Sequence, residues 1–350
     1  MDIYSGLKEA RLNIPMEGGT SAELEGIPVE QAVAVVDIPG EEGEEEATKA
    51  TPPEEEEAIQ KALRDYKSKR PPPYEAAGKI QAPHPSGSNV GTFEEAKLAV
   101  SMEARTFDAA VDDLVELSHD IYYGVEITKS GPMLEKLICL LLGSGSEKFP
   151  AKENKRDKKA AAILAAAVQN NPTALAEIGK LGNIVFSPTC GNELPVPKGN
   201  NIIDILKSRL GRETDPATLK SKVAAIGGLM RDQTIQEYLL KSKVMELLLA
   251  IFLIKGEQWD STRARVAQAV TDNFLDEDVG ATLGIWPQGQ SQQGEYYCGK
   301  TGQMLDDACW AHHVVNFLNG APGTVWAEEF LRALNVQRKK IEEPVKHKEL

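Results

Sequence analysis

The chain has 350 residues, enough for one large or two modest domains, and 41% of them are hydrophobic, which suffices for a sizeable core. Aromatic residues make up only 6%, and this low content beside many Leu, Ala and Lys residues favours helices over a β-sandwich. The formal net charge of −14 comes almost wholly from residues 1–60, which hold 16 acidic and 3 basic side chains. No basic stripe with interleaved aromatic residues is present, which argues against a nucleic-acid-binding protein.

The first predicted region, residues 1–91, is acidic and largely extended or disordered. The carboxylates within the acidic runs at residues 41–46 and 54–57 repel one another, so these segments stay solvated. Three prolines at residues 71–73 enforce an extended stretch, and residues 84–88 have the composition of a linker. The simplest interpretation is a solubilising segment, with binding of a partner as the alternative.

From Thr92 the pattern changes to one helix after another, and we predict an armadillo-like repeat domain over residues 92–285. The pattern Glu-Ile-x-Lys-x-Gly at residues 126–131 returns 51 residues later, at residues 177–182. Lys-Val-Ala at residue 222 returns as Arg-Val-Ala 43 residues later. Helical units that recur every ~40–47 residues are typical of armadillo or HEAT arrays. The alternative is an ordinary helical domain with chance similarity.

Each predicted unit combines a helix of small residues with a bulkier helix. Residues 160–168 and 223–230 are examples of the first kind, and residues 243–254 are an example of the second. The bulky helix carries apolar residues at i, i+3, i+4, i+7 and i+8, the spacing of a buried helical face. Stacked units of this kind form an all-α solenoid with an extended concave surface, which suits binding to another protein. The Pro- and Gly-rich insertion at residues 187–200 explains the one wider spacing.

A helical extension is predicted over residues 286–345, and it contains a nucleotide-binding motif without its usual context. Gly294 to Thr301 matches the Gly-x4-Gly-Lys-Thr phosphate loop, which works where a buried strand enters it and a helix leaves it. The polar residues 287–293 that precede it cannot form a core strand. We therefore expect neither a nucleotide site here nor any cofactor.

The cysteines indicate a disulfide more than a metal site. Cys298 and Cys309 could close a small disulfide loop, whereas Cys139 lies within an apolar helix and is interpreted as a buried free thiol. Cys309 and His313 are spaced i, i+4, but zinc needs three or four ligands and a third is not evident. No nucleophile with an orienting partner is found either, so we expect no metal and no enzymatic activity.

The last residues, 346–350, form a basic-acidic tail that contains a candidate localisation signal. His347, Lys348, Glu349 and Leu350 vary the Lys/His-Asp-Glu-Leu signal that retrieval receptors read on soluble proteins of the endoplasmic reticulum lumen. The first residues lack the apolar run of a signal peptide, and no stretch approaches the ~18 apolar residues of a membrane span. We expect a lumenal protein whose signal peptide precedes Met1. A chance match is the alternative.

Three segments, with this tail, resemble a known family. They are residues 2–13, the sequence Asp-Leu-Val-Glu-Leu-Ser-His-Asp-Ile at 113–121, and Ala-Ala-Ile-Gly-Gly-Leu-Met-Arg-Asp at 224–232. Together they are similar to the fungal, armadillo-repeat nucleotide exchange factors of BiP, the heat-shock-protein-70 chaperone of the endoplasmic reticulum lumen. The resemblance implies a monomeric, non-enzymatic clamp that embraces one lobe of the chaperone's ATPase domain, opens the nucleotide cleft and promotes ADP release, supporting protein folding and translocation. The alternative is an armadillo scaffold or adaptor without exchange activity.

The resemblance also implies that chaperone contacts lie at the polar ends of the small-residue helices. The residues predicted there are His119, Asp120, Asn170, Asn171, Arg231 and Asp232. Arg231 follows an Ala-Ile-x-x-Leu run, where related exchange factors carry a chaperone-contacting arginine, although it could instead form a salt bridge between repeats. Asn170, Asn171 and the following proline could merely terminate a helix.

Overall fold

The protein is helical throughout the part of the chain that the structure describes. The structure, a computed structural model, describes residues 80–84, 87–102, 105–143, 155–190, 201–288 and 294–346. No strand occurs in these ranges, which confirms the predicted all-α class. None of the helices described in them is both long and apolar enough to cross a membrane. The predicted acidic segment up to residue 79 and the tail residues 347–350 lie outside the described residues.

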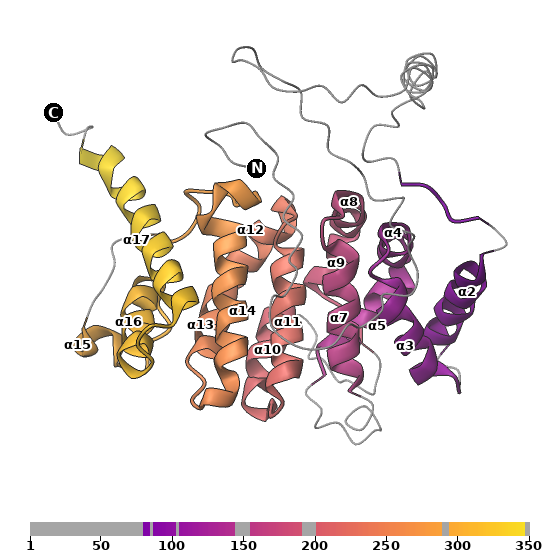
Figure 1. Cartoon of the computed structure of the whole chain (residues 1–350), viewed down its shortest axis with the longest axis horizontal. Helices are drawn as coiled ribbons and strands as arrows, with labels where there is room; N and C mark the ends of the chain where they lie inside the picture. The colour runs from indigo at the N-terminus through magenta and orange to yellow at the C-terminus, as the bar shows by residue number, and fades with distance from the viewer. Residues whose placement is uncertain are drawn as a thin grey trace, which may run out of the picture. The chain divides into compact units, whose positions relative to one another are not determined.

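Fifteen α-helices are described in residues 75–350, which form one compact unit (Figure 1). They are α2 (Ser88–Ser101), α3 (Phe107–Leu117), α4 (Ile121–Lys129), α5 (Gly131–Leu141), α7 (Arg156–Val168), α8 (Pro172–Lys180), α9 (Gly182–Phe186), α10 (Ile202–Arg209), α11 (Pro216–Leu229), α12 (Gln233–Lys241), α13 (Val244–Phe252), α14 (Asp260–Val270), α15 (Glu295–Cys298), α16 (Trp310–Gly320) and α17 (Val325–Lys346). A π-helical turn, η4 (Thr271–Leu275), follows α14.

The internal sequence resemblance corresponds to stacked repeats. Helices α4 and α8, which carry the two copies of Glu-Ile-x-Lys, pack against each other. Each copy forms the same ion pair, with 3.0 Å between Lys129 and Glu126 and 2.8 Å between Lys180 and Glu177. Helices α11 and α14, which carry the second resemblance, are also neighbours. The prediction of a helical-repeat solenoid is therefore confirmed.

Helices α3, α7, α11 and α14 form a row that we call the ladder, and its members contact one another in that order. Figure 1 shows α7, α11 and α14 side by side. Small residues permit this closeness. A Cβ atom on Gly228 would lie 2.6 Å from Val168 Cγ2, and one on Gly227 would lie 3.0 Å from the Ala269 Cβ. The predicted small-residue helices thus exist, although they begin earlier than expected, at Arg156 and Pro216.

A buried lysine ties the ladder together at one point. Lys222, on α11, is 1% exposed, and its Nζ lies 3.0 Å from a carboxylate oxygen of Asp157, on α7. The same Nζ contacts the Glu213 carboxylate and donates to the Gly143 carbonyl, which follows α5. Lys222 therefore joins three segments of the chain through two ion pairs and a hydrogen bond that are largely buried.

Aromatic side chains fasten the C-terminal helices to the repeats. The Trp310 ring, on α16, lies 5.6 Å from Trp286, 6.2 Å from Phe252 on α13 and 5.8 Å from Phe330 on α17. Trp286, Trp310, Phe252 and Phe330 are all at most 2% exposed. The C-terminal helices are thus anchored on the same hydrophobic core as α13 and α14.

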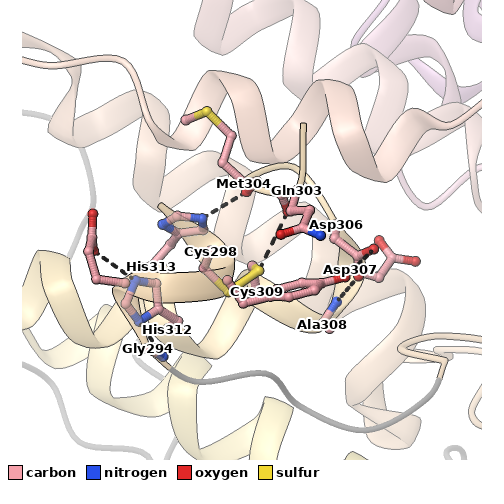
Figure 2. Close-up of a disulfide and its surroundings, with 12 residues drawn as sticks. Gly294, Cys298, Gln303, Met304, Asp306, Asp307, Ala308, Cys309, His312 and His313 are labelled. Carbon is pink, nitrogen blue, oxygen red and sulfur yellow. Dashed lines mark hydrogen bonds and ion pairs between the residues drawn. A yellow bond between two sulfur atoms is a disulfide. The ribbon is translucent and has the colours of Figure 1, made fainter. Parts of the chain in front are cut away.

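The described cysteines all form disulfides. Cys298 is joined to Cys309, the pair that the sequence singled out (Figure 2). The prediction that Cys139 is a free thiol is wrong, because Cys139 is joined to Cys190. The chain after α9 returns to α5, where the Thr189 backbone N–H donates to Glu135 at 3.0 Å, and this contact brings Cys190 within reach.

Candidate functional site

The six predicted contact residues form three pairs at equivalent places in successive repeats. Each pair follows a ladder helix and precedes the next helix of the same repeat. The pairs are His119 and Asp120 between α3 and α4, Asn170 and Asn171 between α7 and α8, and Arg231 and Asp232 between α11 and α12. The two members of a pair have different surroundings, and the structure separates their roles.

The second member of each pair caps the following helix. Asp120 accepts the backbone N–H of Tyr122 at 2.8 Å, and Asp232 accepts that of Ile235 at 3.0 Å. Asn171 accepts the N–H of Ala174 at 3.2 Å. An Asp or Asn side chain in this position satisfies a backbone donor that the helix itself cannot. Asn171, which the sequence suggested could terminate a helix, therefore caps the start of the next one, α8.

Asn171 also links two repeats. Its side-chain amide donates to the Ile121 carbonyl, at the start of α4, over 3.0 Å. The residue is 2% exposed, so its side chain is not accessible to a partner. Asn171 acts in the stacking of α8 on α4.

We expect the substitution Asn171→Ala to lower the free energy of unfolding by about 1–3 kcal/mol, because it removes the helix cap and the hydrogen bond to the Ile121 carbonyl. Urea denaturation measures the change. Asn170→Gly is the matched control, since Asn170 is exposed and has a φ of 52°, which glycine adopts freely. Equal losses in the two variants would contradict the assignment.

The first members of the pairs face a common groove, which we call the ladder groove. It has a volume of about 330 Å³ and is lined by His119, Asn170 and Arg231. Its floor consists of small residues of α7 and α11, among them Ala162, Ala166, Ala224 and Gly228. His119, Asn170 and Arg231 are exposed. The sequence prediction thus named three side chains that the fold brings to one accessible surface.

Helix α14 and the turn after it add polar residues to this groove that the sequence analysis missed. Among them are Arg265, Gln268 and Asp272. Arg265 donates to the Gln268 side chain at 3.0 Å, within the helix. Their spacing of three and four residues places them on one helical face, which is the signal that could have identified them.

Arg231 forms a salt bridge between repeats, and it does so at the edge of the groove. Its Nη2 lies 3.6 Å from Asp272 Oδ2, and the two side chains are 36% and 26% exposed. Burial raises the pKa of the Asp272 carboxyl, and the charges of Arg231 and Arg265 oppose that rise. A partly exposed pair at this distance contributes only ~0–1 kcal/mol, so Arg231 can exchange Asp272 for another acceptor.

The charge of the groove indicates what it can bind. Its lining carries two guanidinium groups, Arg231 and Arg265, against the single carboxylate of Asp272. A partner that presents carboxylates or backbone carbonyls complements this surface.

The Gly294 to Thr301 segment does not have the geometry of a phosphate loop. Residues 295–298 form the short helix α15, and Cys298 within it is completely buried in its disulfide. The Lys300 ammonium lies 3.9 Å from the centre of the exposed Tyr296 ring. The segment is a disulfide-closed turn.

The Cys309 and His313 pair is also used structurally (Figure 2). Cys309 belongs to the disulfide, and His313 Nε2 lies 2.8 Å from the Met304 carbonyl. Burial lowers the pKa of His313, so the ring is neutral and Nε2–H donates to that carbonyl. Within the described ranges, no group of three or more His, Cys, Asp or Glu side chains could hold a metal ion.

Comparison with known proteins gives one match. A model of the nucleotide exchange factor SIL1 family matches residues 88–292, more than half of the chain. The match begins with α2 and includes every ladder helix and both sides of the ladder groove. No curated protein and no solved structure matched the chain.

Proposed function

This chain belongs to the nucleotide exchange factor SIL1 family, and from that premise we propose that it clamps the ATPase domain of the lumenal chaperone BiP and opens its nucleotide cleft. Family membership makes it an exchange factor of the endoplasmic reticulum whose partner is a heat-shock-protein-70 chaperone. The finer proposal concerns the surface that holds the chaperone and the release of ADP.

The ladder groove carries this proposal. His119, Asn170 and Arg231 come from three successive repeats, and α14 adds Arg265 from the next ladder position. A partner that lies along the groove therefore contacts several repeats at once. The Gly and Ala packing holds these helices close together, which restricts their movement relative to one another.

Exchange needs no catalytic group in the clamp. A protein that binds the open position of a lobe more tightly than the closed one shifts the lobe towards the open position. ADP favours the closed position, so the clamp and ADP must weaken each other's binding. The required quantity is a difference in affinity between two lobe positions, and the groove side chains supply the contacts.

The same proposal assigns the remaining predicted residues. Asp120, Asn171 and Asp232 cap the second helix of each repeat, and His119, Asn170 and Arg231 meet the chaperone. The tail residues His347 to Leu350 are read by a retrieval receptor in the endoplasmic reticulum. The protein acts as a monomer without a cofactor, with its repeat domain at residues 92–285 and its extension at residues 286–345.

The proposal is tested by asking whether ADP and this protein weaken each other's binding to the ATPase domain equally. Saturating ADP should weaken the affinity of the ATPase domain for this protein by the same factor as the protein weakens ADP binding, and coupling of this kind is about 5- to 150-fold. Calorimetric titrations with and without ADP, and of ADP with and without the protein, measure both factors. Tight binding that is unaffected by ADP would instead indicate a scaffold without exchange activity.

A further inference from the structure

A second cavity in the described part of the chain lies beside the ladder groove. It is a cleft of about 670 Å³ between α14 and α17, which we call the C-terminal groove. Its lining includes Lys220 from α11, several residues of α14 and η4, and Trp326, Glu329, Phe330 and Ala333 from α17. The predicted contact residues do not account for this cleft.

The cleft exists because α17 carries bulky side chains where the ladder helices carry small ones. Gly227 of α11 lies against Ala269 of α14, so these two helices meet closely. Helix α17 presents Trp326 and Phe330 instead, and it is inclined to α14 (Figure 1). Bulky residues hold the backbones apart and leave an open groove with an aromatic floor.

The floor of the groove is held in place from beneath. The Trp326 ring lies 5.2 Å from Phe317 and 6.3 Å from Phe252, and Phe330 lies 5.8 Å from Trp310. These contacts fix both rings in the hydrophobic core. The groove is therefore preformed, and a ligand does not have to open it.

The two grooves form one surface. Arg265, Gln268 and Asp272 line both of them, so a partner seated in the ladder groove reaches the edge of the C-terminal groove. The charge changes along this surface. Asp276 and Glu329 add two carboxylates to the C-terminal groove, against one further cation, Lys220.

We propose that the C-terminal groove is a second docking site for the same chaperone ATPase domain, and that it receives an apolar side chain flanked by a basic one. This inference rests on the proposed exchange function. The aromatic floor matches the apolar side chain, and the rim carboxylates of Asp276 and Glu329 match the base. The shared α14 residues identify the occupant as the partner that already lies in the ladder groove.

A second docking site has a mechanical consequence. A lobe held only at the ladder groove can pivot about that contact, whereas a lobe held at both grooves has a fixed orientation. A lobe bound in a fixed orientation can be moved outward so that the nucleotide cleft opens, whereas a lobe that pivots can be bound without opening the cleft. The C-terminal groove should therefore affect ADP release as well as affinity.

Two substitutions on α17 test the inference in the full-length protein. Glu329→Lys reverses a rim charge, and Ala333→Arg fills the groove from a position that is half-buried. Each should weaken binding to the nucleotide-free ATPase domain about tenfold and slow stimulated ADP release. Glu328→Lys is the matched control, because Glu328 is exposed on the same helix and does not line the groove. It should change affinity less than about twofold.

The outcomes separate this inference from the proposed function. Wild-type stimulation of ADP release with wild-type affinity in both groove variants would overturn the second docking site and leave exchange activity standing. Failure of the wild-type protein to stimulate release would overturn both. Thermal unfolding of each variant shows that the fold is intact, and the exposed Glu329 position keeps the test valid even where Ala333→Arg destabilises the protein.

Discussion

Replacing Arg231 by glutamate is expected to lower the affinity for the chaperone ATPase domain about a hundredfold, a change of about 2.7 kcal/mol. Arg231 lines the ladder groove together with side chains of α7 and α14. The new carboxylate would stand beside Asp272, and the groove would lose its excess of positive charge. Calorimetric titration against the nucleotide-free ATPase domain measures the effect. Arg231→Ala should give a smaller loss, about tenfold.

The competing role of Arg231, a structural salt bridge, makes a different prediction. The Arg231 to Asp272 pair is 3.6 Å apart and partly exposed, so Arg231→Ala should change the free energy of unfolding by less than about 1 kcal/mol. Arg332→Glu is the matched charge-reversal control, since Arg332 is exposed on α17 and lines neither groove. A large loss of stability in Arg231→Ala, with unchanged affinity of the folded fraction, would establish the salt bridge as its main role.

The substitution Lys222→Ala is expected to cause the largest loss of stability, about 3–5 kcal/mol. Lys222 is 1% exposed and contacts Asp157, Glu213 and the Gly143 carbonyl. Removing its ammonium group takes the buried cation away from the Asp157 and Glu213 carboxylates, and a buried charge that loses its counterion costs more than the pair contributes. Urea denaturation at neutral pH measures the loss.

A combined variant distinguishes two contributions to this loss of stability, namely the removal of the buried counterion and the removal of packed side-chain atoms. Lys222→Met together with Asp157→Asn and Glu213→Gln removes all three charges while keeping similar volumes, and it should recover part of the lost stability. Lys241→Ala, at an exposed lysine of α12, should stay within about 0.5 kcal/mol of wild type. A change below about 1 kcal/mol in Lys222→Ala would contradict a stabilising role for the buried network.

The sequence predicted the repeats and three of the side chains that line the ladder groove. Asn171 with Pro172, and Asp232 with its following helix, mark helix starts through capping chemistry that depends on neighbouring residues alone. The recurrence of Glu-Ile-x-Lys located α4 and α8 because equivalent helices need equivalent packing. His119, Asn170 and Arg231 were named from the family resemblance, and the structure shows that each directly precedes a helix-capping residue.

Features that depend on contacts between distant residues were not predictable in this way. Cys139 looked like a buried thiol because its own helix is apolar, and only the return of the chain after α9 brings Cys190 to it. Lys222 looked like an ordinary charged residue of a repeat, since its partner Asp157 lies on another ladder helix. The C-terminal groove depends on the inclination of α17, which the bulk of Trp326 and Phe330 determines only once both helices are packed.

Release of fluorescent ADP from the chaperone is the most direct test of the exchange function. The chaperone is loaded with the labelled nucleotide, the full-length protein is titrated in with excess unlabelled ATP, and the release rate is followed. We predict a rate that rises with the concentration of the protein and saturates, with Arg231→Glu requiring much higher concentrations to reach the same rate. Release at the spontaneous rate at every concentration of wild-type protein would contradict the assignment of this chain as an exchange factor.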